Sequence, residues 1–150
     1  MASSLEILLL TQVQFWANKP RFIGSIVAGT ALGTATNIAF PVVEDPYSGW
    51  NAGSFFWVVP YSGLYRVSVQ FKWNGTPPGS LPAINVKKNG ANTLVSANAS
   101  STSAFTGVQM TGPVRAVAGD QIAVQLANSG FTTQVDTGAN NFLFIVLESQ

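Results

Sequence analysis

The sequence predicts an all-β protein, a jelly-roll β-sandwich of about ten strands, and three observations favour this fold. Apolar and polar side chains alternate strictly over residues 63–73, which is the period of a strand with one buried face. The pair Asn89-Gly90 separates two apolar runs, and this is the strongest short signal of a β-hairpin. Turn residues punctuate the chain after residue 19, where no helical periodicity is evident.

The strand at residues 63–73 orients the others. Its inward face is expected to carry Tyr65, Val67, Val69, Phe71 and Trp73. Further strands are expected, in chain order, over residues 22–28, 37–43, 54–59, 82–88, 91–97, 105–117, 121–127 and 141–148. Pro41 makes its segment an edge strand or a bulge, and Gly112-Pro113 is expected to interrupt the strand over 105–117.

The last predicted strand is apolar on both faces. One face of a sandwich strand meets the core, so the other must be covered by something else, and a subunit interface is the economical answer. Which face meets the neighbouring subunit stays open at this point. The residues assigned to a homotrimer interface are Phe142, Leu143, Phe144, Ile145 and Leu147.

Two parts of the chain are distinguished, an N-terminal arm at residues 1–19 and a jelly-roll domain at 20–150. The arm has no basic residue before its apolar run and is shorter than the roughly 20 apolar residues that span a bilayer, so neither a signal peptide nor membrane insertion is expected. Its pattern fits a helix or a strand. We expect it to bind a neighbouring chain, with packing on its own domain as the alternative, through Leu5, Ile7, Leu8, Leu9, Leu10, Val13, Phe15 and Trp16.

Charged residues make up only 9% of the chain, against about 25% in typical proteins. Such a deficit indicates that much of the surface is covered in an assembly. The net charge is +1 and the basic residues are scattered, so no nucleic-acid partner is expected. The chain has no cysteine and no histidine, which removes thiolate chemistry and the commonest general base and metal ligand.

Few residues suggest chemistry. The only adjacent carboxylates, Glu44 and Asp45, precede Pro46 and are interpreted as a solvated turn, and Asp120 after Gly119 as a turn residue that binds backbone amides. We therefore expect no enzymatic activity, no cofactor and no metal. Trp50, in a Gly/Asn-rich segment, is the one possible ligand contact in a loop. Trp57 and Trp73 lie in strand runs and are expected in the core or at an interface.

Two motifs suggest a family. The first is Pro-x-x-Gly-x-Tyr at residues 60–65, and the second is Gly119-Asp120 directly before a strand. With the aromatic run before Pro60 and the apolar closing strand, residues 22–148 resemble the fold of tumour necrosis factor and of complement globular heads. This resemblance specifies a fold rather than a ligand. Some complement-head relatives bind calcium, for which Glu44, Asp45 and Asp136 could supply oxygens, but the spacing of a dedicated calcium loop is missing.

Similar modules occur in virion proteins of tailed bacteriophages, usually as homotrimers. The resemblance therefore implies a capsid decoration protein on the particle surface, whose partners are its own copies and the major capsid protein or another virion protein. The alternative is a receptor-binding tip of a tail or fibre that recognises a cell-surface glycan or protein. Decoration is favoured because the large apolar residues lie in the arm, whereas residues 96–103 are small and polar.

Overall fold

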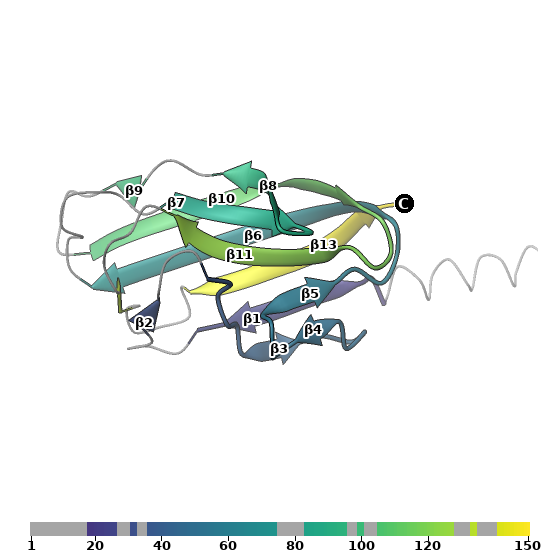
Figure 1. The fold of residues 1–150 in the computed structure, drawn as a ribbon, viewed down its shortest axis with the longest axis horizontal. Helices are drawn as coiled ribbons and strands as arrows, with labels where there is room; N and C mark the ends of the chain where they lie inside the picture. Colours follow the sequence, from purple (N-terminus) through teal and green to yellow (C-terminus); the bar gives the residue numbers. More distant parts are fainter. Residues whose placement is uncertain are drawn as a thin grey trace, which may run out of the picture.

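The computed structural model describes residues 18–26, 31–32, 36–74, 83–95, 99–100, 105–127, 133–134 and 141–150. These residues form a sandwich of antiparallel sheets, and no helix occurs among them, so the predicted all-β jelly-roll fold is confirmed (Figure 1). The first sheet has six strands in the order β3 (Val42–Glu44), β1 (Arg21–Ser25), β13 (Phe142–Ser149), β6 (Gly63–Asn74), β10 (Phe105–Ala116) and β9 (Ala99–Ser100).

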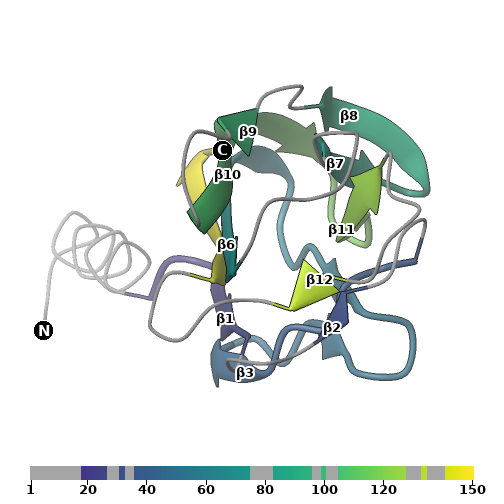
Figure 2. The same cartoon turned by 90° about the vertical axis from the view of Figure 1, so that its left-hand side faces the viewer.

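The second sheet has five strands in the order β4 (Trp50–Asn51), β5 (Phe56–Val58), β11 (Gln121–Ala127), β7 (Ala83–Lys88) and β8 (Ala91–Val95). A separate pair joins β2 (Ala31–Leu32) to β12 (Thr133–Gln134). Figure 2 views the sandwich along its length, with β1, β6 and β10 in one layer and β7, β8 and β11 in the other. The core fills the space between these layers.

Strand β6 has the predicted alternation. Tyr65, Val67, Val69 and Phe71 are at most 1% exposed, whereas Arg66 is exposed on the opposite face. Inward-facing side chains from the second sheet, such as Trp57 and Ile122, are equally buried in the same core. The side chain of Trp73 lies outside the described residues. Burial of large apolar side chains on both sheets is what holds the two layers together.

The Asn89-Gly90 hairpin is confirmed. Both residues have positive φ, 51° and 81°, as the tight turns that join twisted antiparallel strands require. The turn connects β7 to β8, which pair over most of their length.

Two expectations about proline have different outcomes. Pro41 precedes β3, which lies at the edge of its sheet as predicted. Pro113, in contrast, does not interrupt β10, which pairs with β6 without a break from Phe105 to Ala116. On its other side β10 pairs, within the described residues, with β9 at Gly107 and Val108 alone, so no described strand pairs with Pro113 there, and proline is tolerated at such an edge.

Candidate functional site

Strand β13 lies in the middle of the first sheet, between β1 and β6, and its two apolar faces have different surroundings. Leu143, Ile145 and Leu147 are 0%, 0% and 1% exposed and belong to the core of their own chain. Phe142 and Phe144 point outward and are half-buried. Of the residues predicted for a trimer interface, the structure thus leaves only Phe142 and Phe144 on the surface.

The pairing of β13 with β1 adds two further apolar side chains to this surface. Ile23 lies opposite Phe144 and is half-buried, and Val146 is half-buried on the same face of β13. The four side chains that form this outer apolar strip are Ile23, Phe142, Phe144 and Val146. Neither Ile23 nor Val146 was among the residues predicted for the interface. Val146 could have been predicted, because the alternation of the last strand places it on the same face as Phe142 and Phe144. Ile23 could not, because it joins the strip only through the pairing of β1 with β13.

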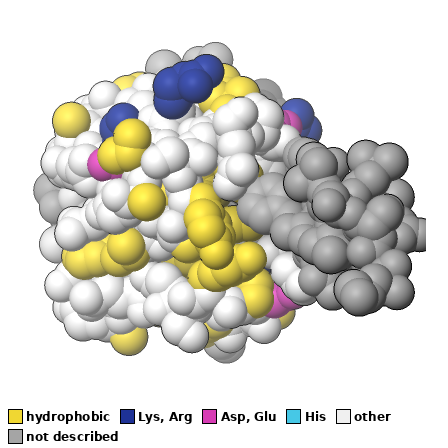
Figure 3. Space-filling model, turned by 90° about the vertical axis from the view of Figure 1, so that its right-hand side faces the viewer, with side chains coloured by type: hydrophobic (Ala, Val, Ile, Leu, Met, Phe, Trp, Pro, Cys, Tyr) yellow, Lys and Arg dark blue, Asp and Glu magenta, His cyan; other side chains and the backbone are white. Residues whose placement is uncertain are grey.

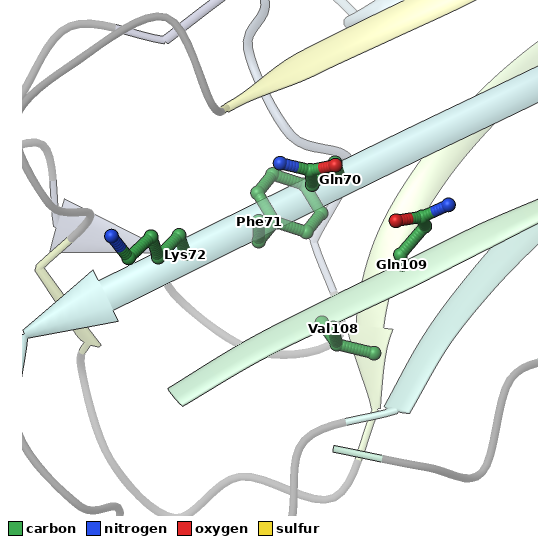
Figure 4. Close-up of a pocket in the computed structure, with 5 residues that line it drawn as sticks. All are labelled: Gln70, Phe71, Lys72, Val108 and Gln109. Atoms are coloured by element: carbon green, nitrogen blue, oxygen red, sulfur yellow. The ribbon is translucent and has the colours of Figure 1, made fainter. Parts of the chain in front are cut away.

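The strip is bordered by polar side chains on β6 and β10. Ser68 lies opposite Phe144 and accepts a hydrogen bond from Thr111, with 3.1 Å between the two hydroxyl oxygens. Gln70 lies opposite Phe142, and together with Lys72 and Gln109 it lines an open pocket of about 310 Å³ (Figure 4). Thus one half of this sheet face is apolar, and the other half is polar and includes the cation of Lys72.

The charges next to the strip are paired within the chain. The guanidinium of Arg21 donates to Glu44, with 2.7 Å between Nε and Oε1, and Arg66 forms an ion pair with Glu148. The hydrogen bond from Arg21 lowers the pKa of the Glu44 carboxyl below its usual value. Since these charges are neutralised locally, a partner that covers the strip does not have to desolvate isolated charges.

A second surface lies at the end of the molecule where β5 connects to β6 and β10 connects to β11 (Figure 1). Hydrophobic side chains gather on this end (Figure 3). Tyr61 and Val117 are 42% and 59% exposed, and the Tyr47 ring meets the Tyr61 ring edge-on, with centroids 5.6 Å apart. The Tyr47 hydroxyl also donates to the carbonyl of Asn18 at 2.6 Å, so the arm joins the domain here. The predicted arm residues from Leu5 to Trp16 lie outside the described residues.

Trp50 differs from the prediction, because it lies in β4 rather than in a loop. Its ring stacks on Phe22 with centroids 4.7 Å apart and meets Phe40 edge-on at 6.4 Å. The Asp45 carboxylate holds this segment in place, since it accepts hydrogen bonds from the Trp50 backbone at 2.8 Å and from the Trp57 indole at 3.2 Å. The aromatic ring is therefore engaged by side chains of its own chain.

The carboxylates of the described residues have structural partners. Glu44 ends β3, and Asp45 begins a turn that the hydrogen bond from the Ser48 backbone N–H to the Asp45 carbonyl closes at 3.1 Å. The predicted turn is therefore present, and its two carboxylates are held as described above. Asp120 is confirmed as a turn residue, because its carboxylate accepts a hydrogen bond from the Val117 backbone at 2.9 Å. Among the described residues, no group of three or more acidic, histidine or cysteine side chains could hold a metal ion, and Asp136 lies outside them. The described part of the chain has no helix of the length and hydrophobicity that crossing a membrane requires.

No protein-family profile matches the sequence, and no curated protein matches it. Solved structures with a similar fold exist. Eiger TNF from S. frugiperda is 13% identical with a TM-score of 0.66, and the match covers 88% of this chain and 94% of that one. Murine APRIL is 16% identical, with a TM-score of 0.59 and coverages of 85% and 98%. The globular domain of zebrafish complement 1qA is 11% identical, with a TM-score of 0.57 and coverages of 89% and 99%.

Proposed function

We propose that this chain is a structural protein of a bacteriophage particle, a capsid decoration protein that associates with its own copies as a homotrimer and attaches through its N-terminal arm. The observation that carries self-association is the outer apolar strip. A strand in the middle of a sheet presents Phe142, Phe144 and Val146 outward, and its neighbour adds Ile23. A fold similar to the TNF and complement structures supports this proposal at the level of architecture only.

The energetics favour a covered strip. Moving a large apolar side chain from full exposure to full burial is worth about 1.5 to 3 kcal/mol, and the strip side chains are already half-buried, so each gains part of that value. The loss of translational and rotational freedom on association opposes this gain. An interface that joined three copies would therefore have to include more than the strip, and the polar border on β6 and β10 is suited to extend it.

Attachment is assigned to the arm because the place where the arm leaves the domain is fixed. The Tyr47–Asn18 hydrogen bond holds the start of the domain, and the apolar residues of the arm precede it. Each copy in a homotrimer would contribute one arm, and three linked arms raise the effective affinity for a lattice by avidity. The particle surface is then the location of the protein, with the capsid or another virion protein as the partner.

Labelling of intact particles tests this function. Particles from the host that makes this protein are treated with a gold-conjugated antibody against the described domain and imaged. Gold distributed over the head is the expected result. Gold confined to the tail or fibre tip would overturn decoration in favour of receptor binding, and particles without label would overturn the virion assignment.

A further inference from the structure

The second sheet carries a pocket of its own on the face turned away from the core, with a volume of about 310 Å³. Strands β7 and β11 supply its centre, and residues next to β5 supply its side. Pockets for small molecules begin at about this volume, so the space suits a single small ligand. The pocket belongs to the sheet opposite the outer apolar strip, so covering the strip leaves it open.

Side-chain amides line this pocket and are fixed in orientation. Gln125 donates from Nε2 to Asn37 Oδ1 at 2.9 Å, and Asn37 donates from Nδ2 to the Ser54 carbonyl at 2.8 Å. This chain of bonds leaves the Gln125 carbonyl oxygen without a partner among the described residues. Gln121 extends an exposed side chain into the same pocket. Amides both donate and accept hydrogen bonds, as the hydroxyl groups of a sugar do.

The pocket also contains a cation, the ammonium group of Lys87. This lysine forms no ion pair or hydrogen bond with another described residue, and none of the described residues that line the pocket is a carboxylate. The next lysine is different, because Lys88 donates to the Arg115 carbonyl at 3.0 Å and lies 3.7 Å from the Asp120 carboxylate. A ligand carboxylate at Lys87 would make a charge-assisted hydrogen bond, which is stronger than a neutral one.

The remaining wall is apolar. Phe56 is half-buried and lines the side of the pocket, and Ala123, which is 7% exposed, lies opposite Lys87 in the sheet register. A pyranose ring has an apolar face of C–H groups that such a wall accommodates. On the same sheet face Asn85 lies opposite Gln125, and its buried Oδ1 finds no donor among the described residues. Buried acceptors without a donor are rare, and they are often completed by a bound water or a ligand.

We propose that this pocket binds a carboxylated sugar unit, with Lys87 contacting the carboxylate, Gln121 and Gln125 contacting hydroxyl groups, and Phe56 covering an apolar face of the ring. This site goes beyond the proposed function and does not rest on it. A decoration protein that carried it would bind acidic polysaccharide through a face that self-association does not use.

Titrations followed by NMR on the isotope-labelled full chain test the site, with glucuronate, glucose and acetate as probes. We expect glucuronate to shift the side-chain amide signals of Gln121, Gln125 and Asn37 and to bind at millimolar concentration, about tenfold more tightly than glucose or acetate. The site is overturned if no pocket signal moves at about 50 mM glucuronate, or if acetate binds as tightly as glucuronate.

Variants assign the roles of the side chains. Lys87→Gln is expected to bind glucuronate and glucose equally, whereas Gln121→Ala is expected to weaken both sugars, and its exposed side chain makes it safe for folding. Arg115→Gln is the matched control, since it removes one positive charge from an exposed side chain on the other sheet and should bind like the unchanged protein. If Arg115→Gln lowers glucuronate binding as much as Lys87→Gln does, the effect is one of net charge and the proposed site is wrong.

Discussion

Asn89 and Asp120 connect the β7–β8 turn to the β10–β11 turn by side-chain hydrogen bonds. Asn89 Nδ2 donates to Asp120 Oδ1 at 2.7 Å, and Asn89 Oδ1 accepts from the backbone of Gln121 at 2.8 Å. The β7–β8 turn is thereby fixed to the start of β11. Because Asp120 also accepts from the Val117 backbone, one carboxylate holds both turns.

Asp120→Asn is expected to remove the contribution of the carboxylate to the free energy of unfolding, and the size of the loss should depend on pH. The hydrogen bond from the Val117 backbone, followed by that from Asn89, lowers the pKa of the folded Asp120 below its unfolded value. Its contribution to stability is therefore fully present above the unfolded pKa and is lost as the pH falls through the folded pKa. The variant should be less stable by about 1 to 3 kcal/mol at pH 7, and this difference should shrink as the pH falls to about 2.

Chemical denaturation at the two pH values measures the difference. The free energy of unfolding of the variant is subtracted from that of the unchanged protein at each pH. Because both proteins contain Glu44, whose pKa is also lowered, its contribution to the pH dependence cancels in this difference. A stability difference that stayed constant down to pH 2 would show that the charge of Asp120 contributes nothing.

Phe144→Asp and Ile145→Asp should give different outcomes although the residues are adjacent. Phe144 belongs to the outer apolar strip, so its replacement is expected to yield a folded monomer. Ile145 is completely buried, so a charge there should prevent folding. Light scattering after size exclusion and circular dichroism distinguish the two.

The matched control for this pair is Val95→Asp, which places the same charge on an apolar side chain that is 61% exposed on β8 of the other sheet. It should keep the oligomeric state of the unchanged protein. If the unchanged chain is itself a stable monomer at micromolar concentration, the homotrimer proposal is wrong.

Val67→Ala and Ser68→Ala test the register of β6. Val67 is fully buried, and the loss of its methyl groups should cost about 1 to 3 kcal/mol through lost burial and a residual cavity. Ser68 lies on the outer face and loses only its hydrogen bond with Thr111, so a smaller cost is expected. Thermal unfolding compares the two variants, and equal costs would contradict the register.

Removal of residues 1–17 should separate folding from attachment. The cut leaves the Tyr47–Asn18 hydrogen bond intact, together with the bond from the Leu147 backbone to the Pro20 carbonyl at 2.9 Å. The shortened chain is therefore expected to unfold at nearly the same temperature and to keep its oligomeric state, but to lose binding to particles. Co-sedimentation with bare particles measures the binding, and near-native binding of the shortened chain would refute the role of the arm.

The fold could be predicted from the sequence because its signals are local. Alternation over residues 63–73 identified the buried face of β6, and Asn89-Gly90 identified a hairpin. The two faces of β13 could not be distinguished in the same way, since both are apolar. What decides between them is the pairing with β6, in which Ile145 lies opposite the buried Val67.

The parts of the molecule that the sequence did not predict depend on contacts between distant residues. Trp50 stacks on Phe22, which is far from it in the sequence, and no local sequence pattern predicts this contact. Likewise the hydrogen bond between Asn37 and Gln125 joins residues 88 positions apart. In the sequence, Asn37 and Gln125 each look like ordinary surface residues, and only the folded sheet brings the two side chains into one pocket.

The position of β13 between β1 and β6 also constrains how the chain can be made. During synthesis β1 emerges first, yet its partner for Arg21–Ser25 is the segment Phe142–Ser149, which is made more than a hundred residues later. Until then the first sheet has a gap at its centre rather than at its edge, and β1 has no strand to join it to β6. Such long-range pairing slows folding and keeps unpaired strands exposed to aggregation. A ribosome that stalled before residue 142 would therefore release a chain that cannot close its core, and quality control would have to remove it.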